Sequence, residues 1–259
     1  MDVLETIINR RTTNTRFADK KVTDEHIETL IKMASHAPSH FNSQPWRFIA
    51  VTDESITAKI AKIGGDSMVR LMEDGRFWKQ YMKYFRFSEE EIEKTKDGIH
   101  IDHVPAILKP FVKSIFTEAG GKVMAKFKVP RILGNDEEKL VASSPILFII
   151  SLTKDEYKPN ELSGFYSVIS MGAVIQTLWL VTTAIGMGMQ FISTPGEIPE
   201  NWKAISGMLN IPDDHEMCAI FRMGYVDPNM KRPTIDWKSS QRKGINDLAF
   251  KDVWGKVLK

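Results

Sequence analysis

Residues 37–48 read APSHFNSQPWRF and are the most informative stretch of the chain. Pro38 and Pro45 restrict the backbone on either side of a run of polar side chains, five of which can form hydrogen bonds. The flanking sequence predicts a helix before this loop and a strand after it. Such a rigid polar loop suits recognition of a flat heterocycle with donors and acceptors along one edge. The alternative interpretation is a rigid surface loop with a solvated His40.

The sequence on either side of this loop predicts mixed helices and strands without regular βαβ alternation. Apolar residues at helical spacing and short apolar runs, such as PILFIISL at 145–152, carry these predictions. Thr23 is a candidate N-cap for the helix that leads into the loop, and Gly186 is a candidate C-cap for a later helix. We expect helices at about 2–9, 24–34, 56–63, 164–185 and 200–208, and strands at about 46–52, 145–152, 189–193 and 216–225.

A long uncharged segment occupies the second half of the chain. No charged side chain occurs between Glu161 and Glu197, and a run of this length could span a bilayer. The run contains several serines and threonines and two glutamines, however, and no basic cluster flanks it. We therefore expect a helix at about 164–185 that is buried on all sides by a core or a subunit interface, and no membrane partner.

The overall composition is that of a globular protein. The chain has 259 residues, of which 42% are hydrophobic and 26% are charged, and we treat residues 1–259 as a single domain. Its 35 basic and 33 acidic residues give a net charge of +2. That balance argues against nucleic acid or an anionic membrane surface as the main partner.

Cysteine usage and the first residues favour a reducing cytoplasm. Cys218 is the single cysteine, so no internal disulfide can form. The sequence has no Cys/His spacing typical of a zinc site, and we expect no metal. Asp2 and Glu5 interrupt the first apolar residues, which is not the pattern of a signal peptide.

Residues 65–140 stand apart from the rest of the predicted domain. The stretch is rich in aromatic and basic residues, including RFW at 76–78, and we expect a helical excursion from the core. Basic residues interleaved with aromatics can stack on single-stranded nucleic acid. Acidic residues between Glu73 and Glu93 offset this charge, so packed amphipathic helices are the favoured interpretation.

Two further segments carry groups suited to a cofactor. Residues 9–17 read NRRTTNTRF, in which guanidiniums, hydroxyls and an amide can cradle a phosphate. Alternatively, Arg10 and Arg11 complement the C-terminus of the preceding helix and stay solvated. Residues 186–196 read GMGMQFISTPG and bring backbone and hydroxyl groups to the end of a strand, or form an ordinary helix–turn–strand. No GxSxG or HExxH motif accompanies them.

Taken together, these segments resemble the nitroreductase family. Residues 10–17 resemble the opening phosphate motif of that family, and the loop at 37–48 resembles its most distinctive segment. Residues 186–193 are similar to its Gly-Leu-Gly segment and the following strand, and QRK at 241–243 resembles the basic pair near its C-terminus. The order and spacing of the four segments carry the resemblance.

The resemblance covers roughly residues 1–64 and 141–250 and implies an α+β fold with a mainly antiparallel central sheet flanked by helices. It also implies an intertwined homodimer with one FMN in each of two sites at the subunit interface. The phosphate is assigned to Arg10, Arg11, Thr12 and Asn14, with Arg242 and Lys243 from the C-terminal segment. The isoalloxazine is assigned to Pro38, Ser39, His40 and Asn42 of the other subunit, with Ser193 and Thr194 near flavin N5.

This sequence departs from the family pattern at two of these positions. The opening motif is one residue longer before Phe17, so Asn14 or Thr15 replaces a basic residue, for which Arg16 can compensate. Glycine is the commoner residue at the position of Thr194.

The activity that the resemblance implies depends on the cofactor and on no catalytic side chain. Flavin N5 accepts hydride from NADH or NADPH, and the electrons then pass to a flat, electron-poor small molecule such as a nitroaromatic or a quinone. We expect FMN and not FAD, because the chain has no GxGxxG fingerprint for a pyrophosphate. The alternatives are a flavin dehydrogenase or dehalogenase on the same fold, a non-enzymatic flavin-binding protein, and a nucleic-acid-associated protein.

Overall fold

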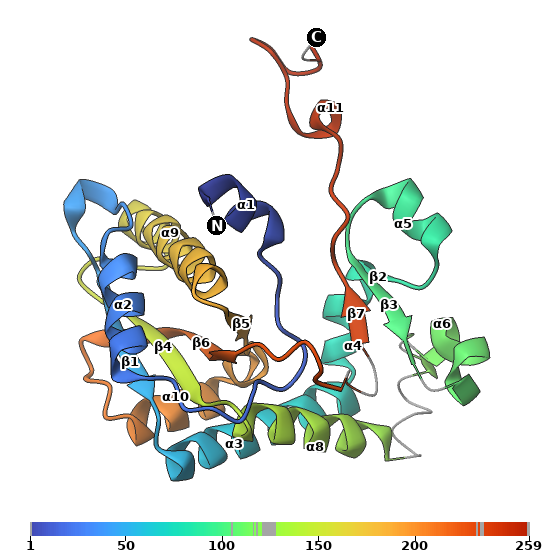
Figure 1. Cartoon of the computed structure of the whole chain (residues 1–259), viewed down its shortest axis with the longest axis horizontal. Coiled ribbons are helices and arrows are strands. Elements are labelled where there is room, and N and C mark those ends of the chain that lie inside the picture. Colours follow the sequence, from blue (N-terminus) through green and yellow to red (C-terminus); the bar gives the residue numbers. More distant parts are fainter. Residues whose placement is uncertain are drawn as a thin grey trace. The chain divides into compact units, whose positions relative to one another are not determined.

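The apolar run at 145–152 forms β4 (Ile146–Thr153), one of the two central strands of a four-stranded sheet (Figure 1). The computed structural model describes residues 2–104, 106–115, 117, 119–120, 128–231, 233 and 236–257. The strand order is β1 (Trp46–Val51), β4, β6 (His215–Tyr225) and β5 (Met187–Phe191). Every neighbouring pair is antiparallel, which confirms the expected sheet.

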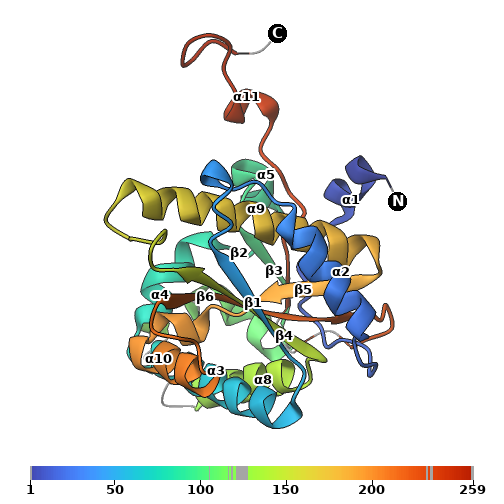
Figure 2. The same cartoon turned by 90° about the vertical axis from the view of Figure 1, so that its left-hand side faces the viewer.

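Both faces of this sheet are covered by helices, and β4 contributes to the core on each side. The helices are α2 (Asp24–Ser35), α3 (Glu54–Glu73), α8 (Val129–Ala142), α9 (Leu162–Ala184) and α10 (Pro199–Met208). Phe148 and Ile150 pack with α2 and α9, whereas the alternating Leu147 and Ile149 pack with α3, α8 and α10. Figures 1 and 2 show the resulting three layers. The uninterrupted apolar sequence of β4 follows from burial on both faces.

Several helix ends form where the sequence predicts them. α1 (Val3–Asn9) begins at Asp2, which forms a reciprocal capping box with Glu5. The hydroxyl of Thr23 caps α2 by accepting a hydrogen bond from the N–H of His26 at 3.3 Å. Gly186 follows α9 with φ +74°, the left-handed conformation that a helix C-terminus favours.

α3 is longer than the sequence predicts. A short helix is expected at 56–63, but α3 continues through two glycines to Glu73. A Cβ atom at Gly65 would lie only 2.7 Å from the backbone oxygen of Gly134 in α8. The two helices therefore pack backbone to backbone at this point, and this packing outweighs the low helix propensity of glycine.

α9 is buried along one face only. The residues on that face recur at helical spacing and are Gly164, Ser167, Ser170, Val174, Leu178 and Thr182. Leu162, Phe165, Val168 and Ile169 are exposed elsewhere on the helix. Burial on all sides, as the sequence predicts, is therefore not reached within one chain. By length and hydropathy α9 could cross a membrane, and only 28% of its most apolar stretch is buried.

Backbone contacts divide the chain into two compact units. Met1–Arg70 with Pro130–Lys231 holds the large sheet, and Leu71–Val129 with Arg232–Lys259 forms the second unit. The second unit has a small sheet in the order β2 (Phe85–Arg86), β3 (Ile99–His103) and β7 (Asp236–Lys238). Its helices are α4 (Arg76–Tyr81), α5 (Glu89–Thr95), α6 (Val112–Ile115) and α11 (Ile245–Leu248), with 3₁₀ helices at Met82–Tyr84 and Ala106–Phe111. Residues 65–140, which the sequence predicts to be helical, thus also contain the strands β2 and β3. Of these, β3 pairs with β7 near the C-terminus.

Candidate functional site

The segment that follows α1 lies along the edge strand β5. Thr12 forms an isolated parallel bridge with Met189, and the N–H of Thr13 donates to the backbone oxygen of Met189 at 3.2 Å. The approach is close, because a Cβ atom at Gly188 would lie 2.1 Å from the hydroxyl oxygen of Thr13. Glycine at 188 therefore allows the segment to dock on the strand.

The two arginines of this segment have different surroundings. The guanidinium of Arg10 lies over the ring of Trp179 in α9, 5.1 Å from the ring centroid. The Nη1 atom of Arg11 donates to the backbone oxygen of Ile8 at 2.6 Å, and the side chain is exposed. Arg11 thus completes the C-terminus of α1, as one of the two interpretations of the sequence expects.

A buried arginine lies beneath the same segment. Arg222 of β6 is 0% exposed, and its Nη2 atom donates to the backbone oxygens of Thr13 at 2.7 Å and Thr15 at 2.6 Å. Its Nε atom donates to Gln190 at 2.5 Å, and its guanidinium lies 4.6 Å from the ring centroid of Phe17. Burial lowers the pKa of Arg222 to about 9, so the group stays charged at neutral pH.

The turn after β5 contains Ser193 and Thr194, the two residues assigned to flavin N5. Thr194 begins the 3₁₀ helix η4 (Thr194–Glu197) and is buried. Its hydroxyl donates to Glu137 of α8. Burial raises the pKa of Glu137 to about 7, the hydrogen bond from Thr194 opposes this rise, and the negative charge of Glu197 adds to it. The turn therefore rests on a carboxyl group that changes charge near neutral pH.

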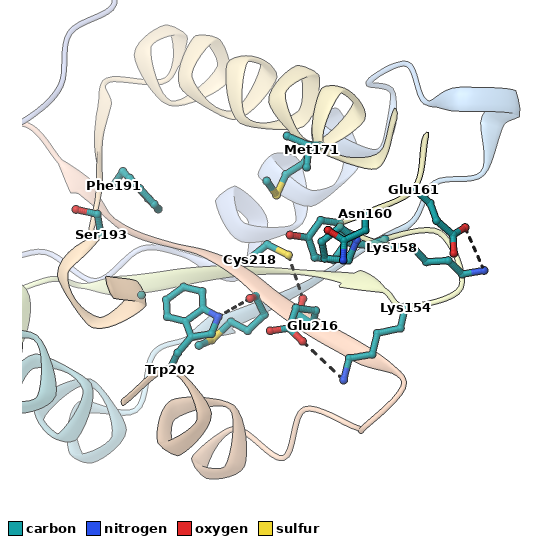
Figure 3. A pocket seen from close by; sticks show the side chains of 15 residues that line it. Lys154, Lys158, Asn160, Glu161, Met171, Phe191, Ser193, Trp202, Glu216 and Cys218 are labelled. Atoms are coloured by element: carbon teal, nitrogen blue, oxygen red, sulfur yellow. Dashed lines mark hydrogen bonds and ion pairs between the residues drawn. The ribbon is translucent and has the colours of Figure 1, made fainter. Parts of the chain in front are cut away.

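A cavity of about 790 Å³ opens next to this turn (Figure 3). Met171 of α9, Phe191 of β5 and Trp202 of α10 give it apolar walls, and Ser193 also lines it. Cys218 lies in the same cavity, and burial raises the pKa of its thiol to about 12, so the reactive thiolate does not form at neutral pH. Size and lining suit an aromatic ligand.

Figure 3 shows Ser193 and Phe191 at one end of this cavity and two ion pairs at the other. Lys154 lies 3.7 Å from Glu216, and Lys158 lies 4.0 Å from Glu161. All four side chains are about half exposed, so these pairs add little to stability. They make the far end of the cavity polar.

The loop at 37–48 has a strained backbone. Phe41, Asn42 and Gln44 have φ values of +46°, +56° and +45°, in the left-handed region that non-glycine residues rarely adopt. Each such residue costs about 1–3 kcal/mol. The Ser39 hydroxyl accepts a hydrogen bond from the N–H of Gln44 at 3.0 Å, and Gln44 donates to the side chain of Asn42 at 3.2 Å. Side chains of the loop thus hold a conformation that is common at binding sites.

His40, within the 3₁₀ helix η1 (His40–Asn42), docks this loop on α9. The His40 ring stacks on Tyr166 with a centroid distance of 4.1 Å, and the backbone N–H of His40 donates to the hydroxyl of Ser170 at 3.3 Å. Arg10 lies over Trp179, about 13 residues further along the same helix. At 1.5 Å per residue this separates the two contacts by roughly 20 Å. Within one chain, the loop and the arginine segment therefore lie toward opposite ends of α9.

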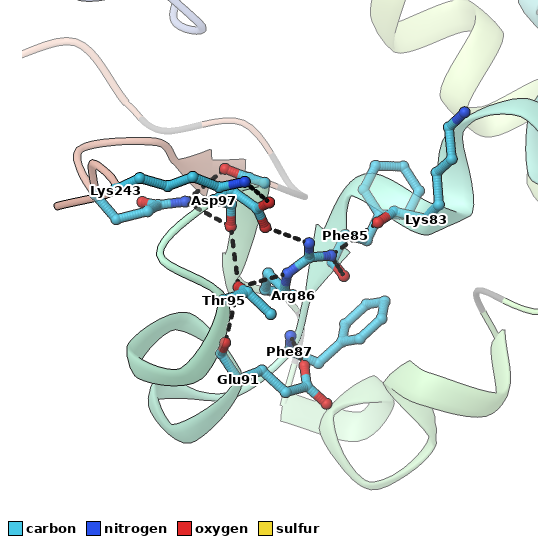
Figure 4. Close-up of polar contacts among 10 residues, drawn as sticks. Lys83, Phe85, Arg86, Phe87, Glu91, Thr95, Asp97 and Lys243 are labelled. Atoms are coloured by element: carbon cyan, nitrogen blue, oxygen red, sulfur yellow. Dashed lines mark hydrogen bonds and ion pairs between the residues drawn. The ribbon is translucent and has the colours of Figure 1, made fainter. Parts of the chain in front are cut away.

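Arg242 and Lys243 belong to the second unit, and Figure 4 shows Lys243 beside Asp97. The Nζ atom of Lys243 lies 3.5 Å from the carboxylate of Asp97, and Arg86 forms an ion pair with the same carboxylate. Nη1 of Arg242 donates to the backbone oxygen of Gln241 at 2.6 Å, and Gln241 donates to the backbone oxygen of Asp97 at 3.2 Å. These contacts tie the C-terminal segment to the region around Asp97.

Two residues of this arrangement are absent from the sequence predictions. Arg222 carries one signal, because it is the charged residue within the apolar run MCAIFRM at 217–223. Glu137 lies among other charged residues and carries no such signal. In the described part of the chain, no group of three His, Cys, Asp or Glu side chains is placed to bind a metal.

Comparison with known sequences gives one family and several distant relatives. The profile of the nitroreductase family matches residues 7–225. An oxygen-insensitive NAD(P)H nitroreductase of Enterobacter cloacae is 35% identical over 69 residues, which are 27% of this chain and 32% of that protein. An iodotyrosine deiodinase of Thermotoga neapolitana is 36% identical over 63 residues, 24% of this chain and 34% of that protein. The matches span about a third of the length of these curated relatives.

Comparison with solved structures supports the fold. A nitroreductase of Bacteroides fragilis with bound FMN superposes with a TM-score of 0.51 at 15% identity. The superposition covers 88% of this chain and 90% of that structure.

Proposed function

Because the chain belongs to the nitroreductase family, a family of flavin oxidoreductases, we propose that it is an FMN-dependent oxidoreductase that uses NADH or NADPH. Its second substrate is a flat, electron-poor acceptor such as a nitroaromatic or a quinone. The observation that carries this proposal is the docking of the arginine segment on β5 above the buried Arg222.

The residues around this segment fit a phosphate monoester. Arg10, Arg11 and Thr12 offer guanidinium and hydroxyl donors, which match phosphate oxygens. Arg222 adds a buried positive charge, and its Nη1 atom has no hydrogen-bond partner among the described residues. A dianionic phosphate near this loop would balance that charge. The resemblance to the family also assigns Arg242 and Lys243 of the C-terminal segment to the phosphate.

The other end of the cofactor fits the turn after β5. Bound FMN would supply hydride transfer at its N5 position, first from the nicotinamide and then to the acceptor. Ser193 and Thr194 would orient the ring through backbone N–H groups and the Ser193 hydroxyl, because the Thr194 hydroxyl already donates its proton to Glu137. The cavity beside the turn would hold the flat substrate. The apolar side chain of Phe191, which lines this cavity, would help to exclude water from it. None of these side chains is required as a nucleophile.

Two features support a homodimer that shares its flavin sites. The apolar side chains of Phe165 and Ile169 on α9 are exposed, as are those of Leu4 and Ile8 on the neighbouring α1. A surface of this kind marks an interaction site. The second feature is the position of the loop at 37–48, which lies far along α9 from the arginine segment of its own chain. A second chain would supply this loop to the shared site.

A reducing cytoplasm suits the single free cysteine.

A dehalogenase is the second candidate function. The similarity to an iodotyrosine deiodinase supports it, because that protein matches over 63 residues and the Enterobacter cloacae nitroreductase over 69, at nearly the same identity. Both candidates use the same cofactor site, so they differ in the acceptor alone.

The test is a cofactor and turnover assay on purified protein. We expect a yellow protein from which FMN is extracted, and oxidation of NADH or NADPH that accelerates when menadione or nitrofurazone is added. Iodotyrosine in place of these acceptors tests dehalogenation. Extraction of FAD alone would exclude the phosphate site described above. Bound FMN without nicotinamide oxidation would indicate a flavin-binding protein that is not this enzyme.

A further inference from the structure

Arg222 is a buried charge without a charged partner. Its hydrogen-bond acceptors are the side-chain oxygen of Gln190 and two backbone oxygens, all of them neutral. In the described residues no carboxylate forms an ion pair with it, and its Nη1 atom contacts no acceptor. Burying an unpaired charge is strongly unfavourable, and apolar residues of similar volume are often equally or more stable at such a position. The cation contacts the Phe17 ring and donates to Gln190, Thr13 and Thr15, but no negatively charged group of the described residues compensates its charge.

The two backbone contacts of Arg222 orient the loop above it. The oxygens of Thr13 and Thr15 point down to the guanidinium. In a trans peptide the carbonyl and the following N–H point in opposite directions, so the N–H groups of Asn14 and Arg16 point away from Arg222. A charged donor on the oxygen polarises the whole peptide group and strengthens its N–H as a donor.

We propose that Arg222 is a positioning residue that holds the Thr13–Phe17 loop in place and supplies positive charge beneath the cofactor phosphate. This inference rests on the proposed FMN-dependent function and extends it to a residue of β6. Arg222 acts through the loop, and it also supplies long-range attraction in a poorly screened interior. The side-chain oxygen of Gln190 accepts a hydrogen bond from the Nε atom of Arg222 and so helps to fix the orientation of the guanidinium.

The experiment compares FMN with riboflavin, which has the same ring system and lacks the phosphate. Dissociation constants for both flavins are measured by fluorescence quenching on the apoprotein. In Arg222→Met, the affinity for FMN should fall by about ten- to a hundredfold, because two charged hydrogen bonds and the charge are lost. The affinity for riboflavin should stay within about twofold of the wild type. The preference for FMN, the ratio of the two constants, is the readout.

A second variant tests the same inference in case Arg222→Met does not fold. Gln190→Glu keeps the arginine and places a carboxylate against its Nε atom, which neutralises the buried charge with little change in shape. The preference for FMN should fall in this variant as well, and thermal unfolding of the apoprotein identifies the variants that remain folded. Arg70→Met is the matched control, since Arg70 is an exposed cation on α3 whose pair with Glu200 is long, at 3.9 Å. It should leave the preference unchanged.

The outcomes separate this inference from the proposed function. If the wild-type protein binds FMN no more tightly than riboflavin, the phosphate site itself is wrong. If the wild type prefers FMN and folded Arg222→Met or Gln190→Glu keeps that preference, Arg222 has no role at the phosphate. Equal losses of FMN and riboflavin affinity would assign it a purely structural role. The ³¹P resonance of bound FMN should also shift between wild type and Arg222→Lys. Lysine retains the positive charge but lacks the planar set of donors that the guanidinium has.

Discussion

Glu137 is a buried carboxyl group whose ionisation should affect the stability of the fold. Its pKa is raised from 4.5 to about 7, so between these values the folded protein retains a proton that the unfolded chain has lost. The free energy of unfolding should therefore fall as pH rises from about 4.5 to 7, and stay level above that. The loss amounts to about 3 kcal/mol, at about 1.4 kcal/mol for each pKa unit.

Glu137→Gln tests this contribution, because glutamine keeps an acceptor for the Thr194 hydroxyl and cannot ionise. Urea unfolding of the apoprotein should show the variant matching the wild type near pH 5 and exceeding it by up to about 3 kcal/mol near pH 8. Parallel pH profiles for the two proteins would show that Glu137 does not titrate in this window.

Arg11 and Arg242 test the proposed phosphate site from the two ends of the sequence. If both contact the phosphate, Arg11→Ala and Arg242→Ala should each weaken FMN binding by about 1.5–3 kcal/mol, the contribution of a charged hydrogen bond. Flavin titration of the apoproteins measures the change. Lys203→Ala, which removes an exposed cation from α10, is the control and should bind FMN normally. Unchanged FMN affinity in both arginine variants would move the phosphate elsewhere.

At the scale of single residues, a contiguous motif can be recognised in the sequence more easily than a buried charged group. Arg10 and Arg11 fall in a contiguous motif, so their proximity needs no knowledge of the fold. Arg222 and Glu137 meet their partners across long stretches of sequence, and their burial depends on how β6 and α8 pack. The periodicity of apolar residues in the sequence cannot show that a charged side chain is buried, because that burial depends on tertiary packing.

At the scale of elements, packing partners decide where the predictions succeed. β4 is correctly predicted because both of its faces are buried, which leaves an uninterrupted apolar run. α3 is predicted too short because the close approach of α8 makes glycine favourable inside a helix. The sequence does not predict the small strands β2 and β3, since β2 has only two residues and β3 pairs with the distant β7, so neither strand carries a local pattern.

A substitution in the loop at 37–48 should affect FMN binding and dimerisation without lowering the stability of the subunit. Phe41 is 93% exposed and has a left-handed backbone, so it contributes little to the core of its own chain. Phe41→Gly should relieve the strain and leave the stability of the subunit unchanged or about 1 kcal/mol higher. If the loop reaches the partner's flavin site, the same variant should weaken the dimer and the binding of FMN.

Chemical unfolding and sedimentation measure these two effects of Phe41→Gly separately. A variant that dimerises and binds FMN like the wild type would show that the loop takes no part in the shared site. A variant with lower subunit stability would show that Phe41 packs against its own chain.

At the scale of the whole molecule, dimerisation and FMN binding should be one event. We expect the wild-type protein to sediment as a dimer and FMN to stabilise that dimer by mass action. Ile169→Glu places a charge on the exposed face of α9 and should yield a poorly folded, flavin-free monomer. Ile132→Glu on α8 is a matched control, because both isoleucines are 54% exposed. It should remain dimeric and yellow.

Sedimentation of dilute protein with and without FMN, followed by flavin absorbance, distinguishes the outcomes. A stable monomer that retains stoichiometric FMN would refute the shared site and the dimer together. Solubilisation only in detergent would instead indicate that the apolar face of α9 meets lipid.

The docking of Thr12 and Thr13 on β5 also affects solubility. β5 is an edge strand, and an uncovered edge offers free N–H and C=O groups to which another chain can add a strand. The bridge at Met189 occupies the middle of that edge. The segment proposed to hold the phosphate therefore also shields the sheet from edge-to-edge aggregation. Heated protein that has lost its flavin should form intermolecular β-structure sooner than the yellow protein, beginning at β5.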